Sequence, residues 1–175
     1  MRTERLVMRQ WQDSDREPFA ALTADPQVME HFPNRLSRAQ SDAFVDRMAA
    51  ALDRNGYGLW ALEVAGTGAF IGFAGLQRAT FEAPFTPDME VGWRLARSAW
   101  GHGYATEAAR AAVRYAFTEL DLAELVSFTV PANVRSQAVM RRLGMTHDEA
   151  DDFDHPRIPP GHPLRRHVLY RLRRP

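Results

Sequence analysis

The sequence contains no cysteine among its 175 residues. This absence excludes disulfide bonds, zinc sites with thiolate ligands and a cysteine nucleophile. An excess of either charge is also missing, because 22 basic residues balance 22 acidic ones. Global charge therefore gives no reason to expect nucleic acid or an anionic membrane as a partner.

Long hydrophobic runs are missing as well. No apolar stretch approaches the ~18 residues of a membrane span, and the start Met1-Arg2-Thr3-Glu4-Arg5-Leu6 has no apolar signal region. We therefore expect a soluble, cytoplasmic protein without a membrane partner. The length suits a single domain over residues 1–175. The hydrophobic share of 45% and the charged share of 25% are ordinary for a globular chain.

Hydrophobic periodicity and turn residues divide the chain into strands and helices. The predicted strands are Glu4–Trp11, Leu59–Val64, Ala69–Leu76, Met89–Leu95, Glu124–Val130, His147–Asp151 and Arg166–Leu172. The predicted helices run from Asp13 to about Ala24, from Ser37 to Asn55, from Tyr104 to about Leu120 and over Asn133–Leu143. Loops are expected at Phe81–Pro87 and from Asp154 to Pro163. The order β-α-α-β-β-β-α-β-α-β-β predicts an α+β (α/β) fold, with four helices flanking one mixed, mostly antiparallel sheet of about seven strands.

A glycine turn precedes the helix that begins at Tyr104. It reads Gly101-His102-Gly103-Tyr104-Ala105. A helix start offers unpaired N–H groups and a partial positive charge, and glycines let a phosphate approach the backbone closely. His102 and Arg97 would add charge at the rim. The turn fits neither a P-loop nor a dinucleotide fingerprint, so a simple turn and a phosphate site both stay open on this evidence.

A second polar motif, Asn133-x-x-Ser136, begins the last predicted helix. Asn133 occupies the position of an N-cap, and Ser136 falls in the first turn. Taken alone, both residues are also typical of an ordinary helix start.

Taken together, the motifs resemble the GNAT superfamily of acetyl-CoA-dependent N-acetyltransferases, and most closely its RimJ/RimL-type group of ribosomal-protein N-terminal acetyltransferase-like sequences. The resemblance covers nearly the whole chain in the right order. The matching segments are Arg5–Trp11, Met89–Leu95, Trp100–Ala108, Asn133-x-x-Ser136 with Leu143-Gly144-Met145, and His167–Tyr170. Two positions depart from the superfamily pattern: Trp100 stands in place of Gln or Arg, and His102 in place of Lys or Arg.

The resemblance implies how acetyl-CoA would bind. The strand Glu90–Leu95 would splay from the strand Glu124–Val130, and the pantetheine arm would lie in the gap between them. Asn133 would hydrogen-bond that arm, and Ser136 would lie near the thioester sulfur. The residues expected to contact the donor are Trp93, Arg94, Leu95, Arg97, Gly101, His102, Gly103, Tyr104, Ala105, Thr106, Asn133 and Ser136. No metal is expected.

A mechanism follows from the same comparison. Because the chain has no cysteine, we expect direct transfer to a primary amine in a ternary complex, without an acyl-enzyme. Glu90 is the candidate general base and Ser136 the candidate acid or sulfur hydrogen-bond donor. His155 is a second candidate base.

The acceptor is less defined by the sequence. Phe32 and Phe85 are predicted to form apolar walls of its site, near His155. A peptide N-terminus and a small-molecule amine both stay open as acceptors, as does a homodimer. The alternative function is a non-catalytic, regulatory acyl-CoA-binding domain on the same scaffold.

Overall fold

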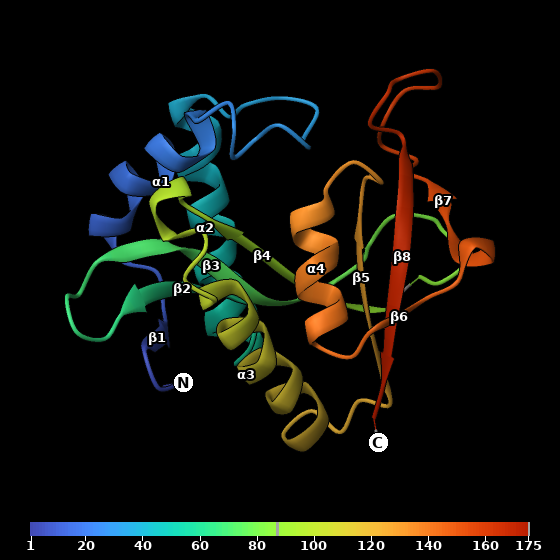
Figure 1. Cartoon of the computed structure of the whole chain (residues 1–175). Helices are drawn as coiled ribbons and strands as arrows, with labels where there is room; N and C mark the ends of the chain where they lie inside the picture. The colour runs from blue at the N-terminus through green and yellow to red at the C-terminus, as the bar shows by residue number, and fades with distance from the viewer. Residues whose placement is uncertain (87, 175) are drawn as a thin grey trace.

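The computed structural model describes residues 1–86 and 88–174 and contains one twisted sheet with helices on both faces (Figure 1). The strands found in this part of the chain are β1 (Leu6–Arg9), β2 (Leu59–Val64), β3 (Phe70–Arg78), β4 (Met89–Leu95), β5 (Glu124–Thr129), β6 (Thr146–His147), β7 (Phe153–Asp154) and β8 (Arg166–Arg173). The α-helices are α1 (Arg16–Ala24), α2 (Arg38–Asn55), α3 (Tyr104–Thr118) and α4 (Val134–Arg142). No helix among the described residues is both long and apolar enough to cross a membrane.

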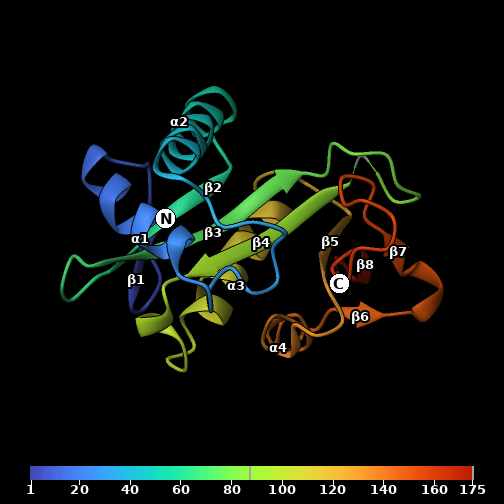
Figure 2. The same cartoon turned by 90° about the horizontal axis from the view of Figure 1, so that it is seen from above.

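The sheet order is β1-β2-β3-β4-β5-β8-β6, with β7 paired to β8 outside this path. Viewed from above, α1 and α2 lie on one face of β1–β4 and α3 on the other (Figure 2). Every neighbouring pair is antiparallel except β4 and β5, which are parallel. The predicted fold class is therefore confirmed, with eight strands in the described residues rather than about seven.

The predicted bounds of β2 and β4 match the structure, and the other helices and strands differ from prediction mostly at their ends. The predicted strand His147–Asp151 is wrong. The chain leaves β6 at His147 because the Asp148 carboxylate accepts the Ala150 N–H at 2.9 Å and begins a 3-10 turn at Glu149–Asp151. The unpredicted strand β7 follows. In the predicted loop Phe81–Pro87, Pro87 lies outside the described residues.

The contact between β3 and β4 depends on a glycine. The two strands pair without interruption from Gly72 opposite Leu95 to Arg78 opposite Met89. A Cβ on Gly72 would lie only 2.2 Å from the carbonyl oxygen of Arg94, and the backbone there has a φ of 129°. Glycine thus permits the close approach that holds β4 firmly on this side.

Two apolar clusters lie on the sheet. The larger is formed mainly by β1–β4 and the inner faces of α1, α2 and α3, and it extends to residues of β5, α4 and β8. The alanines of α3 from Ala108 to Ala116 are almost fully buried, so this helix lies close to the sheet. The smaller cluster centres on Phe85, Val126, Phe153 and Leu169, beside β5 and β8.

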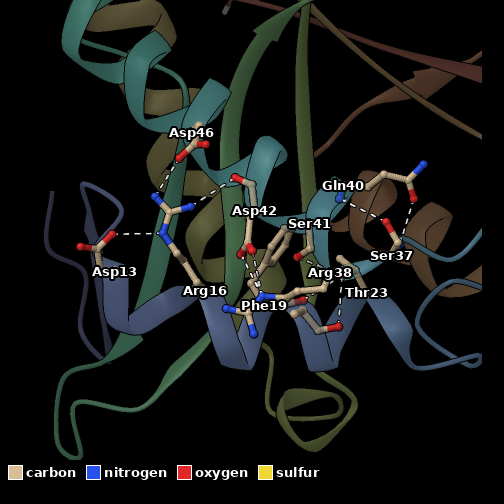
Figure 3. A network of polar contacts seen from close by, with 11 residues as sticks. Asp13, Arg16, Phe19, Thr23, Ser37, Arg38, Gln40, Ser41, Asp42 and Asp46 are labelled. Atoms are coloured by element: carbon tan, nitrogen blue, oxygen red, sulfur yellow. Dashed lines mark hydrogen bonds and ion pairs between the residues drawn. The ribbon is translucent and has the colours of Figure 1, made fainter.

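Polar contacts fix α1 against α2 (Figure 3). Arg16 of α1 reaches the carboxylates of Asp13 at 3.0 Å and Asp46 at 2.7 Å. The buried Thr23 hydroxyl meets Ser41 of α2 at 3.3 Å. The start of α2 has a capping box, in which Ser37 accepts from Gln40 N–H. The connection between the helices is consequently anchored at both of its ends.

A buried ion pair ties β1 to the start of α1. Arg9 binds Asp15 through Nη1 at 2.7 Å and Nη2 at 2.9 Å, and its Nε donates to Glu63 of β2 at 2.7 Å. Asp15 is only 1% exposed and also accepts the Gln12 N–H at 2.8 Å. Hydrogen bonding to Asp15, opposed by burial and aided by Glu63, raises the pKa of Arg9.

We expect Asp15→Asn to lower the free energy of unfolding by about 3 kcal/mol, because it leaves the Arg9 guanidinium in a desolvated place with one carboxylate fewer. Urea unfolding monitored by circular dichroism measures the change. Asp46→Asn is the matched control, since the Asp46 side chain is 63% exposed in its pair with Arg16 and should give a much smaller loss. Equal losses in the two variants would contradict the prediction.

Candidate functional site

A cavity of about 1420 Å³ opens where β4 and β5 diverge. Its walls come from β4, β5, the starts of α3 and α4, the connection between α1 and α2, and the segment after β7. The short pairing between β4 and β5 explains why the cavity opens here. β4 pairs with β5 only at Glu90 opposite Val126, so the edge of β4 from Val91 onward has no strand partner on this side. An unpaired edge presents N–H and C=O groups that an extended ligand can pair with.

The predicted phosphate turn forms one end of the cavity. Gly101 and Gly103 both have a φ of 80°, a conformation that disfavours residues with a side chain. Gly103 is the N-cap of α3, and the first helical hydrogen bond runs from Glu107 N–H to Gly103 O at 3.0 Å. Tyr104, Ala105 and Thr106, whose amides precede this bond, line the cavity, and a helix start favours an anion there.

Two of the predicted phosphate ligands stay outside the cavity lining. The ring of His102 stacks on Tyr104 with centroids 5.5 Å apart. Arg97 lies on the surface, with its guanidinium 3.0 Å from the side-chain oxygen of Gln27 and 3.7 Å from Asp25. Neither side chain is among the residues that line the cavity.

Arg5 braces the turn from outside, a role that its sequence position did not reveal. Its Nη1 donates to the carbonyl oxygen of His102 at 2.9 Å, and its Nε to Glu107 at 2.7 Å. Thr3 adds a hydroxyl hydrogen bond to Glu107 at 2.6 Å. Burial alone would raise the Glu107 pKa, but the hydrogen bonds from Thr3 and Arg5 outweigh it and hold that pKa below its ordinary value. The first turn of α3 is thereby fixed in place.

Trp93, Arg94 and Leu95 of β4 all line the cavity. Their backbone is paired with β3 on one edge and free of β5 on the other. Because side chains alternate along a strand, Arg94 points to the face opposite to that of Trp93 and Leu95. A ligand on the free edge of β4 would thus meet two differently lined sides.

Asn133 is the N-cap of α4. Its Oδ1 accepts the Ser136 N–H at 3.2 Å, and its Nδ2 donates to the hydroxyl of Thr129 at 2.9 Å. Both ends of the amide are thus already bonded within the protein, and only its remaining lone pair and hydrogen face elsewhere. Ser136 lines the same cavity, and its hydroxyl bonds to no residue in the described parts of the chain.

Glu90 lies at the vertex where β4 and β5 part. Its Oε2 accepts from Nε2 of Gln77, its partner on β3, at 2.8 Å. Burial raises the pKa of Glu90 to about 7, although the Gln77 hydrogen bond and the positive charge of Arg94 both act to lower it. The carboxylate still lines the cavity and is partly exposed there. It is therefore a group that exchanges protons near neutral pH.

His155 also lines the cavity, from the segment after β7. Its ring lies 4.4 Å from that of Phe81 and 5.1 Å from that of His167, between ring centroids. Burial, together with the positive charges of His167 and Arg157, lowers the pKa of His155 to about 4. Its Nδ1 accepts the Arg157 N–H at 3.2 Å. His155 is thus a neutral imidazole at neutral pH and a weak base.

The structure separates the two predicted acceptor phenylalanines. Phe32 lines the cavity from the α1–α2 connection and is 37% exposed. Phe85 is only 6% exposed and does not line the cavity. A turn in which Thr86 N–H bonds to Ala83 O at 3.1 Å directs it inward, onto Phe153 at 4.9 Å between ring centroids. Phe85 supports the wall that carries His155 rather than forming the surface.

The chain matches a family model described as an acetyltransferase (GNAT) domain over residues 5–146. It is 36% identical over 170 residues to an FsC-acetyl coenzyme A-N(2)-transacetylase of Aspergillus fumigatus, a match that covers 92% of this chain and 71% of that protein.

Solved structures agree with the family model. An acetyltransferase from Agrobacterium tumefaciens is 30% identical, with a TM-score of 0.78 over 99% of this chain and 94% of that one. RimL, a ribosomal L7/L12 alpha-N-protein acetyltransferase solved in complex with coenzyme A, has the same fold at 18% identity. Its TM-score is 0.75 over 98% of this chain and 95% of that one.

The raised pKa of Glu90 predicts a pH-dependent stability. The Glu90 carboxyl has an ordinary pKa of 4.5 in the unfolded chain and a pKa of about 7 in the folded one. Between these two pH values, the unfolded chain has lost the carboxyl proton while the folded chain keeps it. The wild-type free energy of unfolding should thus fall over this range, because the unfolded state releases the proton first. Glu90→Gln removes the effect, so the variant should match the wild type near pH 4.5 and exceed it by about 3 kcal/mol at pH 8.

Urea unfolding at several pH values between 4.5 and 8 measures this difference. Glu119→Gln, at an exposed position near the end of α3, controls for the loss of a negative charge. A Glu90→Gln difference that does not change with pH would show that the wild-type carboxyl is not held protonated in the folded protein.

Proposed function

Because the chain belongs to the GNAT family of acetyltransferases, we propose that it passes the acetyl group of acetyl-CoA directly to a primary amine within a ternary complex. The family predicted from the sequence is confirmed, and so is an acetyl-CoA-dependent N-acetyltransferase activity. The direct transfer and the roles of individual residues are the proposal. One observation carries it: a single cavity connects the open helix start of α3 with the partly buried carboxylate of Glu90.

The donor would lie along the free edge of β4. Its pyrophosphate would accept hydrogen bonds from the amides between Gly101 and Thr106, with the partial positive charge of the helix start. Its pantetheine arm would pair with the backbone of Trp93–Leu95, as an added strand does. Asn133 and Ser136 of α4 face the same cavity and would meet the arm and the thioester from the opposite side.

Glu90 would act as the general base. The incoming amine must be neutral to attack the thioester carbonyl, and a base is most effective when its pKa lies near the working pH. The Glu90 pKa of about 7 meets this condition, whereas that of His155, about 4, makes the imidazole a weaker acceptor of protons. The geometry supports the same choice, because Glu90 lies on the strand that would hold the donor.

The reaction would then proceed as follows. The amine nitrogen forms a bond to the carbonyl carbon, and its proton passes to the Glu90 carboxylate. A backbone N–H of β4 stabilises the oxyanion. The C–S bond breaks, and the thiolate of coenzyme A leaves. The Ser136 hydroxyl donates a hydrogen bond to that sulfur, although a thiol with an ordinary pKa of ~8.5 is a good leaving group and needs little help.

The acceptor stays open between peptide N-termini and small amines. The relatives differ in what their names state: one acts on FsC and another on the N-terminus of a ribosomal protein. The predicted RimJ/RimL-type group and the predicted homodimer stay predictions. The alternative, a regulatory acyl-CoA-binding domain, would bind the donor and release no thiol toward any amine.

Initial-rate kinetics tests the ternary complex. We expect intersecting lines in double-reciprocal plots when acetyl-CoA and an accepted amine are varied together, because no residue forms an acyl-enzyme. Parallel lines, with acetyl-protein detected by intact mass, would contradict direct transfer. All 22 basic residues of the chain are arginines, so the side chains offer no primary amine and background acetylation is confined to the N-terminus.

The pH profile tests the base. In the wild type, kcat/KM should rise with pH through about 7, the pKa of Glu90. Glu90→Gln should lower kcat about 100-fold and remove this inflection. His155→Gln should keep the inflection, and Ser136→Ala should lower kcat less than Glu90→Gln does. An inflection that disappears in His155→Gln and persists in Glu90→Gln would reverse the assignment.

A further inference from the structure

The guanidinium of Arg94 lies on the cavity wall, where the charge of the Glu90 carboxylate acts on it without forming an ion pair. Its Nε is buried and has no hydrogen-bond partner, and no described residue forms an ion pair or side-chain hydrogen bond with it. Its contacts are aromatic. Its Cζ lies 3.9 Å from the ring centroid of Phe32 and 5.5 Å from that of Phe73. Buried donors are normally satisfied in folded proteins, so an unsatisfied one indicates that a water or a ligand completes its hydrogen bonding.

Arg94 stands in one row with Glu90. Side chains two residues apart on a strand share a face, so Glu90, Gly92 and Arg94 all point to the side covered by α1 and α2. Their partners on β3 are Gln77, Gly75 and Phe73. Gly92 places no side chain between the two charged groups, and all three residues line the cavity. The row thus places a carboxylate and a guanidinium on the same face of β4, with no side chain of the strand between them.

We propose that the acceptor is an amine that also carries a carboxylate, and that Arg94 binds this carboxylate while Glu90 receives the amine proton. The proposal rests on the proposed function and names the substrate class of the same site. It extends the role of β4: the backbone would hold the donor, and the Arg94 side chain would select the acceptor.

The contacts of Arg94 favour a carboxylate at this point. Two aromatic rings lie against the guanidinium, and no described residue accepts a hydrogen bond from its N–H groups. The edge of a guanidinium is a planar fork, which a carboxylate accepts in two parallel hydrogen bonds. Burial lowers the pKa of Arg94 to about 10, so it stays charged at neutral pH. A positive group in a poorly solvated place would repel a second cation, so a polyamine is a poor occupant.

The competing explanation is structural. Arg94 could serve only to hold Phe32 and the α1–α2 connection over the cavity by cation–π contact. This role would need no anion and would not depend on the charge of the acceptor. The two explanations therefore predict different substrate preferences.

The experiment measures coenzyme A release from matched pairs of acceptors. The panel is the standard amino acids, β-alanine and 4-aminobutyrate, each beside its carboxamide, with rates expressed per concentration of neutral amine. We expect the wild type to favour the best acid over its carboxamide by about thirtyfold in kcat/KM, the size of a charge-assisted contact. In Arg94→Met, the ratio should fall to near unity while the KM for acetyl-CoA stays within about twofold, since only the side chain changes.

Three variants separate the explanations. Arg94→Lys keeps the charge without the fork and should retain part of the preference. Phe32→Leu removes the ring but keeps the guanidinium, so it should retain the preference if Arg94 binds the acceptor. Arg38→Met is the matched control, because Arg38 pairs with Asp42 on the surface of α2 and lies outside the cavity lining. If Arg94→Met does not fold, the wild-type ratio and the Arg94→Lys ratio decide.

Equal or higher rates with the carboxamides would overturn the inference and leave the proposed function standing. A preference for acids that survives in Arg94→Met would also overturn it, because another group would then bind the carboxylate. Spermidine and a peptide with an amidated C-terminus are assayed beside the panel, and coenzyme A release from these alone, with no acid accepted, would overturn the inference by itself. No release from any amine, although acetyl-CoA binds by calorimetry, would overturn the proposed function as well.

Discussion

In the described chain, β4 and β5 are the parallel neighbours of an otherwise antiparallel sheet, and they pair at a single position, Glu90 opposite Val126. The seven residue pairs between β3 and β4 hold one edge of β4 in place. The sheet therefore opens along the other edge of β4, where β5 turns away from it. That edge provides the cavity, the unpaired backbone and the vertex at which Glu90 sits. A closed β4–β5 ladder would satisfy the same backbone groups and leave no space for a donor.

The vertex also sets the charges of the site. Burial drives the Glu90 pKa up and the Arg94 pKa down, so each group is pushed toward its neutral form, and their mutual attraction opposes both shifts. The ordinary pKa of a glutamate is low, so burial brings the pKa of Glu90 up to about 7, near neutral pH. The ordinary pKa of an arginine is so high that Arg94 stays charged at neutral pH even with its pKa lowered to about 10. One desolvated face of β4 therefore holds a group that exchanges protons beside one that does not.

The features predicted from the sequence are those with local causes. The bounds of β4, the glycine turn and the Asn133 cap depend on neighbouring residues, and motif and periodicity found them. The brace from Arg5 to Glu107 joins positions about a hundred residues apart, and no local pattern marks it. The inward turn of Phe85 depends on packing against Phe153, so an aromatic residue in a loop was wrongly expected to line the cavity. The lack of a hydrogen-bond partner for the buried Nε of Arg94 among the described residues depends on its surroundings and has no sequence signal.

Under the proposed function, alternation along β4 would separate the two substrates within one cavity. Trp93 and Leu95 point toward the α3 side, where the start of the helix is open, whereas Glu90 and Arg94 point toward Phe32 and the α1–α2 connection. The donor would use the backbone, which every sequence supplies, so substitutions at side chains on the acceptor face need not disturb it. On this proposal, replacing alternate residues of one strand and the connection above it would change the choice of acceptor. This separation would give a physical reason why relatives of the same fold can be named for different acceptors.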